Sequence, residues 1–345
     1  MSRIGKIGLD TFEKFVMQRL GRGNENIIVP PESGVDAAVI DIENEKVLVI
    51  AEDPIFPTPG QPLDTFGWYI VHIGASDVAV MGVKPEYMTY SLLMPPDTKD
   101  EDFKAIVDSI HKTAKELDIS IVGGHTGYYP AVNTPIIGGI TVFAIADKDD
   151  YVTPRGAQVG DKVILTKGPA IEATGLLALV YEEKLLKKLP LQLIERAKGY
   201  LQEMTVVKDA LVAKSCGGVT AMHDATEGGV IGGLFEVASA SDVGMLVDER
   251  RFVYPDEVKL VMEFLDIDPV EAISEGTLII TALPDRADNI VKALAKEGIP
   301  SSIIGEVLPK ENGRIIIRLD GMEEPLRIPE QDPFWPAFFK GLEKK

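Results

Sequence analysis

The order of apolar segments along the chain constrains its fold more than any other feature. Short runs such as DAAVID (36–41), KVLVIA (46–51) and YMTYSLLM (87–94) predict strands. Residues 62–81 predict a largely buried helix. In residues 102–117 apolar side chains recur at three- and four-residue spacing, opposite charged ones. Strands that alternate with helices of this length indicate an α/β fold.

A polar segment separates two halves of similar pattern. Residues 148–161 carry one proline and two glycines, and a chain of 345 residues exceeds what one hydrophobic core usually serves. We expect an N-terminal domain over residues 1–150, a C-terminal domain over residues 151–330 and a tail over residues 331–345. The first domain should form a homodimer through its sheet, because a small sheet with apolar faces on both sides needs cover.

The net charge limits the partners of the protein. With 35 basic against 54 acidic residues the chain has a net charge of −19, so it repels nucleic acid and anionic lipid. The first residues lack the apolar run of a signal peptide, and no stretch approaches the roughly 18 apolar residues of a membrane helix. We expect a cytoplasmic protein that binds neither nucleic acid nor membrane.

Four aspartates stand near the ends of predicted strands or helices, beside small residues: Asp36, Asp53, Asp77 and Asp224. Carboxylates in such positions can approach a hard cation closely, and magnesium commonly bridges protein carboxylates to nucleotide phosphates. Each aspartate alone is better explained as a turn or helix-capping residue. As a set they predict a magnesium site, because an acidic cluster among small residues is a poor way to build a core.

A glycine-rich segment in the second half predicts a phosphate contact. In MHDATEGGVIGGLFEVA, Asp224 or Thr226 could cap a helix that begins at Glu227. Gly228 and Gly229 would then leave the amides of the first turn bare for a phosphate. The alternative is that the glycines serve a tight contact between the helix and the sheet.

Two further segments and the single cysteine carry weaker predictions. VGGHTG ends a predicted strand (120–124) and brings Gly123, Gly124, His125 and Thr126 to a position where they could contact the nucleotide, although a histidine in such a loop is common without a ligand. Cys216, the one cysteine, follows a predicted helix and is expected to be a buried structural thiol. Residues 9–20 predict an amphipathic helix. No residue is nominated as catalytic.

The motifs, taken in order, resemble those of the superfamily that contains aminoimidazole ribonucleotide synthetase, thiamine-monophosphate kinase, selenophosphate synthetase and HypE. SGVDAAVI is similar to G-D-D-A-A-V-I, IAEDPI to a T-D-S motif, and VHIGASDVAVMGVKPEYM to V-H-G-T-V-N-D-L-A-V-M-G-A-K-P. IVGGHTG resembles V-G-G-D-T, and MHDATEGGVIGGLFEVA resembles M-R-D-P-T-R-G-G-L. The segments around MHDATEGG and GVKP are most similar to HypE, a hydrogenase-maturation protein.

The resemblance implies a two-domain fold of the aminoimidazole ribonucleotide synthetase type, with ATP between the domains. It implies that acidic residues of the first domain hold Mg2+, that this domain pairs with its twin in a dimer, and that another maturation protein is a partner. Some positions depart from the family pattern. Val35 and His125 each stand where the family has aspartate, and Ser76 replaces an asparagine. HypE also ends in a cysteine that is carbamoylated and dehydrated to thiocyanate, whereas this sequence ends in LEKK.

Three functions remain open on this evidence. The first is a HypE-like ATP-dependent enzyme that activates a carbonyl or amide oxygen by phosphorylation, without a terminal cysteine to act on in cis. The second is a non-catalytic nucleotide-binding or scaffold protein, which the lost acidic positions favour. The third is a small-molecule kinase resembling thiamine-monophosphate kinase.

Overall fold

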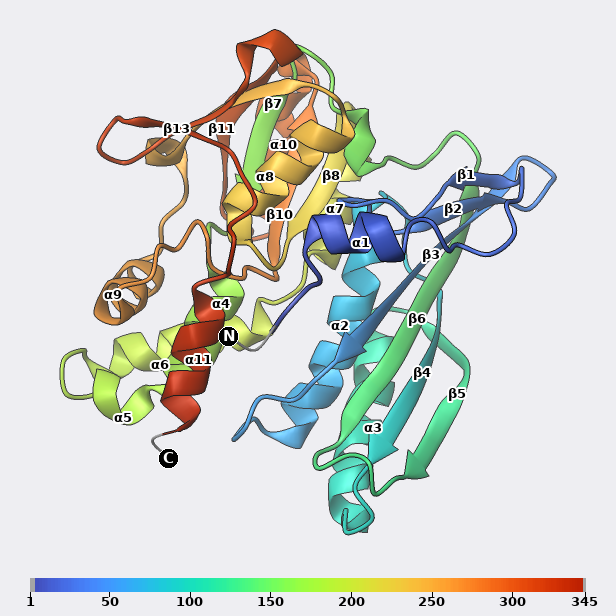
Figure 1. The fold of residues 1–345 in the computed structure, drawn as a ribbon, viewed down its shortest axis with the longest axis vertical. Helices are drawn as coiled ribbons and strands as arrows, with labels where there is room; N and C mark the ends of the chain where they lie inside the picture. Colours follow the sequence, from blue (N-terminus) through green and yellow to red (C-terminus); the bar gives the residue numbers. More distant parts are fainter. Residues whose placement is uncertain (1–3, 344–345) are drawn as a thin grey trace. The chain divides into compact units, whose positions relative to one another are not determined.

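The computed structural model describes residues 4–343, which form two compact units (Figure 1). The N-terminal unit holds residues Glu25–Pro30 and Asp36–Tyr151. The C-terminal unit holds the residues from Val152 onward, together with those up to Asn24 and Pro31–Val35. The chain therefore passes from one unit to the other within the polar segment 148–161. The start of the chain, which we expected in the first domain, belongs to the C-terminal unit.

A six-stranded sheet and two helices build the N-terminal unit. The sheet has the order β1-β2-β3-β6-β4-β5, and all its pairs are antiparallel except β4 with β5. Its elements are β1 (Ile27–Val29), β2 (Ala38–Asp41), β3 (Lys46–Ile55), α2 (Leu63–Val80), β4 (Tyr87–Met94), α3 (Asp100–Glu116), β5 (Ser120–Tyr128) and β6 (Ile136–Asp147). Helix α2 packs on β3 and β6, and α3 packs against α2. The helices thus cover one face of the sheet.

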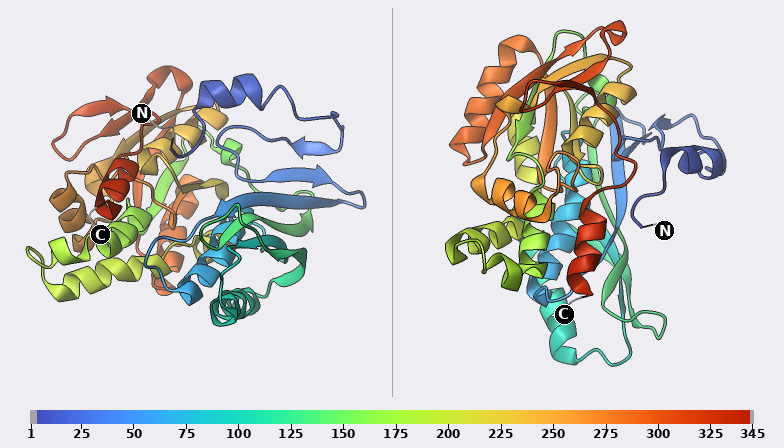
Figure 2. Two further views of the ribbon diagram at one scale, coloured as in Figure 1. Left: turned by 60° about the horizontal axis from the view of Figure 1, so that its bottom comes forward. Right: turned by 60° about the vertical axis from the view of Figure 1, so that its left-hand side comes forward.

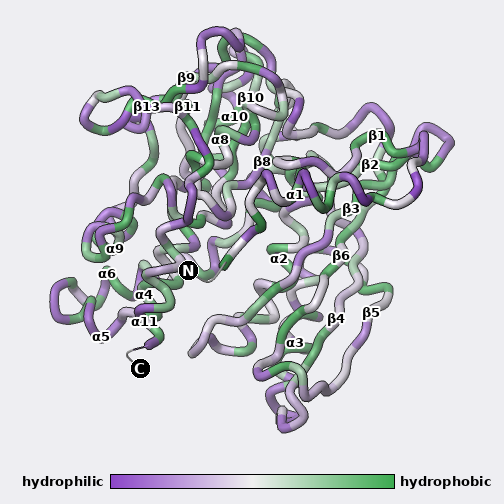
Figure 3. The backbone as a smooth tube through the Cα atoms, viewed as in Figure 1, coloured by the Kyte–Doolittle hydropathy of each residue, from purple (hydrophilic) through white to green (hydrophobic). Residues whose placement is uncertain are grey.

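The two helices differ as their sequences predict. Helix α2 is buried along most of its length, whereas α3 alternates apolar and charged residues and buries one side only (Figure 3). Acidic residues fill the first turn of α3 and Lys115 lies in its last turn, which suits the helix dipole. Gly74 of α2 permits close contact with the sheet, since a Cβ there would stand 3.0 Å from Ile140.

The C-terminal unit is built on a seven-stranded sheet of order β13-β12-β9-β11-β7-β10-β8. Its strands are β7 (Lys162–Thr166), β8 (Val219–Ala225), β9 (Gly244–Asp248), β10 (Thr277–Ala282), β11 (Ser301–Leu308), β12 (Arg314–Ile317) and β13 (Glu323–Pro325). Helix α8 (Gly229–Ala240) packs on one face, where Leu234 joins Val163 and Ile279 in the core. Helices α7 (Val207–Ser215) and α10 (Pro284–Lys296) pack against each other and against the sheet.

A helical layer completes this unit beyond the sheet. It consists of α4 (Ile171–Val180), α5 (Glu182–Leu185), α6 (Leu191–Gly199), α9 (Asp256–Leu265) and α11 (Phe334–Leu342). The last helix, red in Figures 1 and 2, lies beside α4, where the Tyr181 hydroxyl donates to the carbonyl of Ala337. No helix among residues 4–343 is both long enough and apolar enough to span a membrane.

Two predicted elements have different lengths in the structure. The helix expected over residues 9–20 is only α1 (Leu9–Phe15). Phe15, Val16 and Leu20 remain exposed, so a longer helix would gain little burial, and short helices without packing are marginal. The strand expected over residues 120–124 continues as β5 to Tyr128, because β4 offers it a parallel partner up to Met94.

One ion pair in the C-terminal unit is almost fully buried. The Lys167 ammonium lies 2.9 Å from an oxygen of Asp209, and the two side chains are 7% and 3% exposed. The ammonium also donates to the carbonyl of Thr205 at 2.7 Å. This pair ties the end of β7 to the first turn of α7. Removing one partner leaves the other charge buried without compensation.

We therefore expect Asp209→Asn to destabilise the protein by about 3 kcal/mol, measured from the shift of the urea unfolding midpoint. The control is Glu297→Ala, which breaks the exposed pair between Lys208 and Glu297. That change should leave the midpoint unchanged within error, since solvent screens such pairs. Equal losses in the two variants would contradict the role assigned to the buried pair.

Candidate functional site

The predicted metal ligands of the N-terminal unit come from adjacent elements. Asp53 lies on β3, on the side of the strand that carries the buried residues packed towards α2. Its cross-strand partner Ile140 touches Gly74 of α2, and Asp77 follows Gly74 by three residues on the same helix. Asp53 and Asp77 therefore belong to one region of the unit, where the sheet meets α2. Asp36 lies in the chain just before β2.

These carboxylates do not by themselves make a closed metal site. Among the described residues of the N-terminal unit, no three histidine, cysteine, aspartate or glutamate side chains bring ligand atoms within 4.8 Å of one another. Magnesium, however, keeps several waters and takes few protein ligands when it carries a nucleotide. The donors present are hard oxygens and fit such an ion. They suit a cation whose remaining ligands are phosphate oxygens and water.

The fourth aspartate lies in the C-terminal unit, on β8. Asp224 is buried beside His223, whose ring Nε2 lies 3.0 Å from a carboxylate oxygen of Glu236 on α8. Burial of Glu236 opposes its ionisation, but the hydrogen bond and charge of His223 hold the pKa of Glu236 below its usual value. Neither His223 nor Glu236 is among the residues predicted from the sequence. The signal was present, since His223 precedes Asp224 and Glu236 follows the glycine pair by two helical turns.

The glycine-rich loop between β8 and α8 is tightly fixed. Gly228 and Gly229 both have positive φ, and a Cβ on Gly229 would stand 2.5 Å from the carbonyl oxygen of Val270. The amide of Gly228 donates to Asp332 at 2.9 Å, and that of Gly229 donates to the carbonyl of Thr226. We expected the first-turn amides to be bare, but those of Gly229 and Ile231 both donate to carbonyl groups of the protein. The helix also begins at Gly229 rather than Glu227.

Carboxyl groups surround this loop. Asp332 is 3% exposed and accepts hydrogen bonds from the amides of Gly228 and Phe334, yet burial raises its pKa to about 6. Glu172, in the first turn of α4, accepts a hydrogen bond from the amide of Glu275. Although part of its surface is accessible, loss of hydration raises the pKa of Glu172 to about 8, and the charges of Asp332 and Glu227 raise it further.

The second predicted nucleotide segment lies elsewhere. Gly123, Gly124, His125 and Thr126 belong to β5, the edge strand of the N-terminal sheet. They lie within the strand rather than in a loop after it. His125 is exposed, and its Nε2 lies 2.5 Å from the hydroxyl of Tyr129. Gly124 has φ +137°, and a Cβ placed there would stand 2.1 Å from the carbonyl oxygen of Tyr90 on β4, so this position requires glycine.

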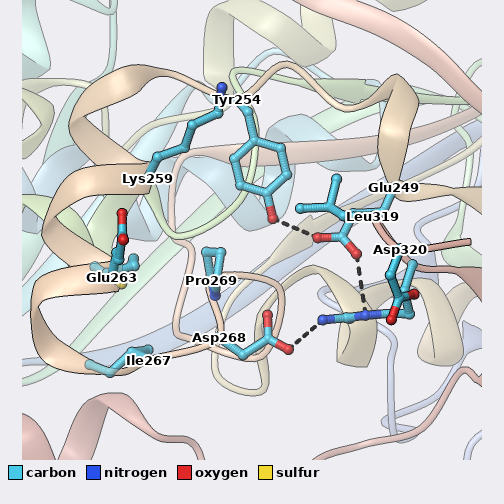
Figure 4. Close-up of a pocket in the computed structure, with 11 residues that line it drawn as sticks. Glu249, Tyr254, Lys259, Glu263, Ile267, Asp268, Pro269, Leu319 and Asp320 are labelled. Atoms are coloured by element: carbon cyan, nitrogen blue, oxygen red, sulfur yellow. Dashed lines mark hydrogen bonds and ion pairs between the residues drawn. The ribbon is translucent and has the colours of Figure 1, made fainter. Parts of the chain in front are cut away.

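A hollow of about 440 Å³ opens elsewhere in the C-terminal unit, between α9 and the turn after β12 (Figure 4). At its base the Tyr254 hydroxyl donates to Glu249, as Figure 4 shows. Arg318 lies 3.2 Å from Glu249 and 2.5 Å from Asp268. Arg318 is thus already paired with two carboxyl groups, and none of the predicted site residues lines the hollow. We interpret this network as structural.

Cys216 is less enclosed than we expected. It lies at the C-terminal end of α7 and is half-buried, so the prediction of a largely buried thiol is wrong. Its Sγ lies 3.3 Å from the carbonyl oxygen of Val212, within the same helical turn. The helix ends there because Gly217 and Gly218 both take positive φ. The thiol is thus fixed on a helix end.

The fold and the ordered motifs define a family. Residues 34–146 match the N-terminal domain of the AIR synthase related proteins, and residues 158–318 match the C-terminal domain of the same proteins. The chain belongs to the AIR synthase related family. This confirms the resemblance inferred from the motifs, and the two-sheet α/β architecture expected from it.

Particular members of the family are similar over nearly their whole length. Carbamoyl dehydratase HypE of Rhizobium leguminosarum bv. viciae is 25% identical over 308 residues, which cover 85% of each chain. HypE in a HypE–HypF complex superposes with a TM-score of 0.73 at 21% identity, covering 92% of this chain and 99% of that one. The hydrogenase maturation protein HypE in complex with ATP has a TM-score of 0.69 at 22% identity, covering 87% and 89%.

The raised pKa of Glu172 predicts a pH-dependent stability. The unfolded side chain titrates near 4.5 and the folded one near 8. Between these values the folded state holds a proton that the unfolded state releases, so stability falls as the pH rises from about 4.5 to about 8. Glu172→Gln removes this loss while keeping an oxygen to accept the hydrogen bond from Glu275.

We expect the thermal midpoint of the wild type to drop more between pH 5 and pH 8 than that of Glu172→Gln. Differential scanning calorimetry at the two pH values measures both drops. Glu183→Gln changes an exposed glutamate on α5 and serves as the control, which should follow the wild type. Parallel curves for the wild type and Glu172→Gln would refute the buried, protonated state of Glu172.

Proposed function

We propose that this chain is an ATP-dependent enzyme that activates a carbonyl or amide oxygen by phosphorylating it, in the maturation of a hydrogenase metal centre. The observation that carries the proposal is the similarity to a carbamoyl dehydratase over 85% of the chain. The retained Asp36, Asp53, Asp77 and Asp224 support it, because a chain that had lost nucleotide chemistry has no need of four aspartates at strand and helix ends.

The proposed reaction converts a carbamoyl group to a nitrile. The carbamoyl oxygen attacks the terminal phosphorus of ATP and ADP leaves; the phosphorylated oxygen then departs as phosphate while nitrogen loses its two protons. One proton ends on phosphate and one in solution. The carbamoyl group thus loses one oxygen and two hydrogens, the elements of the water molecule that hydrolysis of ATP to ADP and phosphate requires. Such chemistry needs positioning and charge stabilisation more than covalent help from the protein.

The residues of this chain divide these tasks. Asp36, Asp53 and Asp77 would hold Mg2+, which neutralises charge on the phosphates when it is bound. His223 and Asp224 are buried at the end of β8, and Glu236 of α8 pairs with His223, so these groups can orient a ligand near the loop 226–229. Glu172 holds a proton at neutral pH and can donate a hydrogen bond there, which an ionised carboxylate cannot.

The carbamoyl group that accepts the phosphoryl group of ATP would belong to another molecule. The sequence holds one cysteine, Cys216, and its half-buried place on a helix end denies it the mobility of a carrier thiol. We therefore propose a carbamoyl group carried by a partner maturation protein or a small molecule. The relative that was crystallised as a HypE–HypF complex supports a partner protein of this kind.

Nucleotide binding tests the proposal first. Titration calorimetry of the wild type with Mg-ATP should show binding. Asp53→Asn should weaken this binding about tenfold or more, because it removes a carboxylate ligand of the magnesium ion that contacts the phosphates. Asp108→Asn, an exposed aspartate on α3, is the matched control and should bind as the wild type does. Binding without phosphate release would favour the non-catalytic function, and no binding would overturn both.

The open face of the N-terminal sheet supports the proposal of a homodimer. Helices cover one face only, and the other carries a stacked pair, Tyr87 and Phe143, whose ring centroids lie 5.4 Å apart. Leu48 and Ile50 of β3 lie on the same face, and Ile145 there is 47% exposed. An apolar sheet face of this kind is normally covered by another layer. A second copy of the chain would provide that cover.

Phe143→Glu places a charge in the middle of this face and should convert the dimer to a monomer. Light scattering coupled to size-exclusion chromatography measures the mass of each species. His111→Glu adds the same charge on the exposed side of α3 and should leave the dimer intact. A wild-type monomer at working concentration would exclude the homodimer.

A further inference from the structure

Gly5 and Lys6 lie against the glycine-rich loop between β8 and α8. The amide of Lys6 donates to a carboxylate oxygen of Glu227 at 2.9 Å, and its ammonium donates to the hydroxyl of Thr226 at 2.9 Å. Gly5 makes this contact possible, because it has φ +92° and a Cβ there would stand 2.0 Å from Glu227. A backbone donor, a charged donor and a close approach thus converge on two residues more than 200 positions away.

The charge of Lys6 matters because the loop is otherwise acidic. Its positive charge lowers the pKa of both Glu172 and Glu236, whereas Glu227 and Asp332 act in the opposite sense on Glu172. A phosphate group brought to this loop would meet the carboxylates of Glu227 and Asp332 and be repelled. A cation must offset them, and the structure places the ammonium of Lys6 there.

The backbone of the loop has little left to offer an anion. The amide of Gly228 is taken by Asp332 and that of Gly229 by the carbonyl of Thr226, while Ile231 donates to Val270. The usual means by which a helix N-terminus binds phosphate is therefore largely used within the protein. Side chains must supply the contact instead. The hydroxyl of Thr226 and the ammonium of Lys6 are donors that already meet at the loop.

We propose that Lys6 is a phosphate-binding residue. Its side chain moves so that the ammonium, which here donates to Thr226, instead contacts the terminal phosphate of a bound nucleoside triphosphate. The segment that carries Lys6 thereby forms part of the nucleotide site. This inference rests on the proposed ATP-dependent function and adds to it a ligand-contacting residue that lies outside the motifs of the sequence. An ammonium suits the task because it is a compact charge with three donors.

The test compares Lys6→Ala with the wild type by calorimetric titration with Mg-ATP and Mg-ADP. We expect the Kd for ATP to rise at least tenfold, and the Kd for ADP to rise less, since ADP lacks the terminal phosphate. Lys6→Arg should recover part of the affinity. Lys14→Ala is the matched control, because Lys14 lies on the same N-terminal segment and its ammonium faces the ring of Phe15; it should bind ATP as the wild type does.

The outcomes separate this inference from the proposed function. If the wild type binds ATP and Lys6→Ala binds it with the same Kd, the role of Lys6 is overturned and the proposed function still stands. Equal losses for ATP and ADP also overturn it, because they indicate a structural effect on the loop. Absence of ATP binding in the wild type overturns the proposed function itself. Should Lys6→Ala fail to fold, Lys6→Gln, which keeps the length and hydrogen-bonding capacity without the charge, is expected to show the same ATP-specific loss.

Discussion

The left-handed turn at Gly228 and Gly229 sets the geometry of the C-terminal unit around its predicted site. Two successive residues with positive φ let the chain leave β8 and enter α8 while passing within contact of the Val270 carbonyl. The amide of Gly228 then points at Asp332, which ties the segment before α11 to the loop. A side chain at Gly229 would clash with the carbonyl of Val270, and one at Gly228 would be strained by its positive φ. The start of α8, the last helix and the N-terminal segment all depend on this turn.

In the proposed function the same loop faces a ligand that is still more acidic than the protein. Burial raises the pKa of Glu172 to about 8, so this side chain is mostly uncharged at neutral pH and less negative charge faces the loop than the sequence suggests. Lys6 offsets part of the remainder. The aspartates of the N-terminal unit must stay ionised if they are to hold a cation. A divalent cation would then lie between these carboxylates and the phosphates and offset their repulsion. In the proposed function, repulsion between carboxylates and phosphate is therefore reduced by a protonated carboxyl group and Lys6 in the C-terminal unit, and by a divalent cation in the N-terminal unit.

Periodicity predicted most elements well because it reports burial directly. Strand β4 has the predicted bounds, and α3 extends the prediction by two residues at its start and ends one residue earlier. The family, too, followed from ordered motifs. What the sequence could not supply was long-range contact. The pairing that extends β5, the carboxylate that occupies the amide of Gly228 and the seat of Lys6 on Thr226 all join residues far apart in the chain. The half-exposed state of Cys216 is likewise set by packing rather than by local composition.

The central claim is that the chain transfers an oxygen from a carbamoyl group to phosphate at the expense of ATP. A synthetic peptide that carries an S-carbamoyl cysteine with an 18O-labelled carbonyl tests it most directly. After incubation with the wild-type protein and Mg-ATP, mass spectrometry should find one 18O in the released phosphate and a thiocyanate on the peptide. Unlabelled phosphate with an unchanged peptide would mean that water attacks ATP, and would contradict the account.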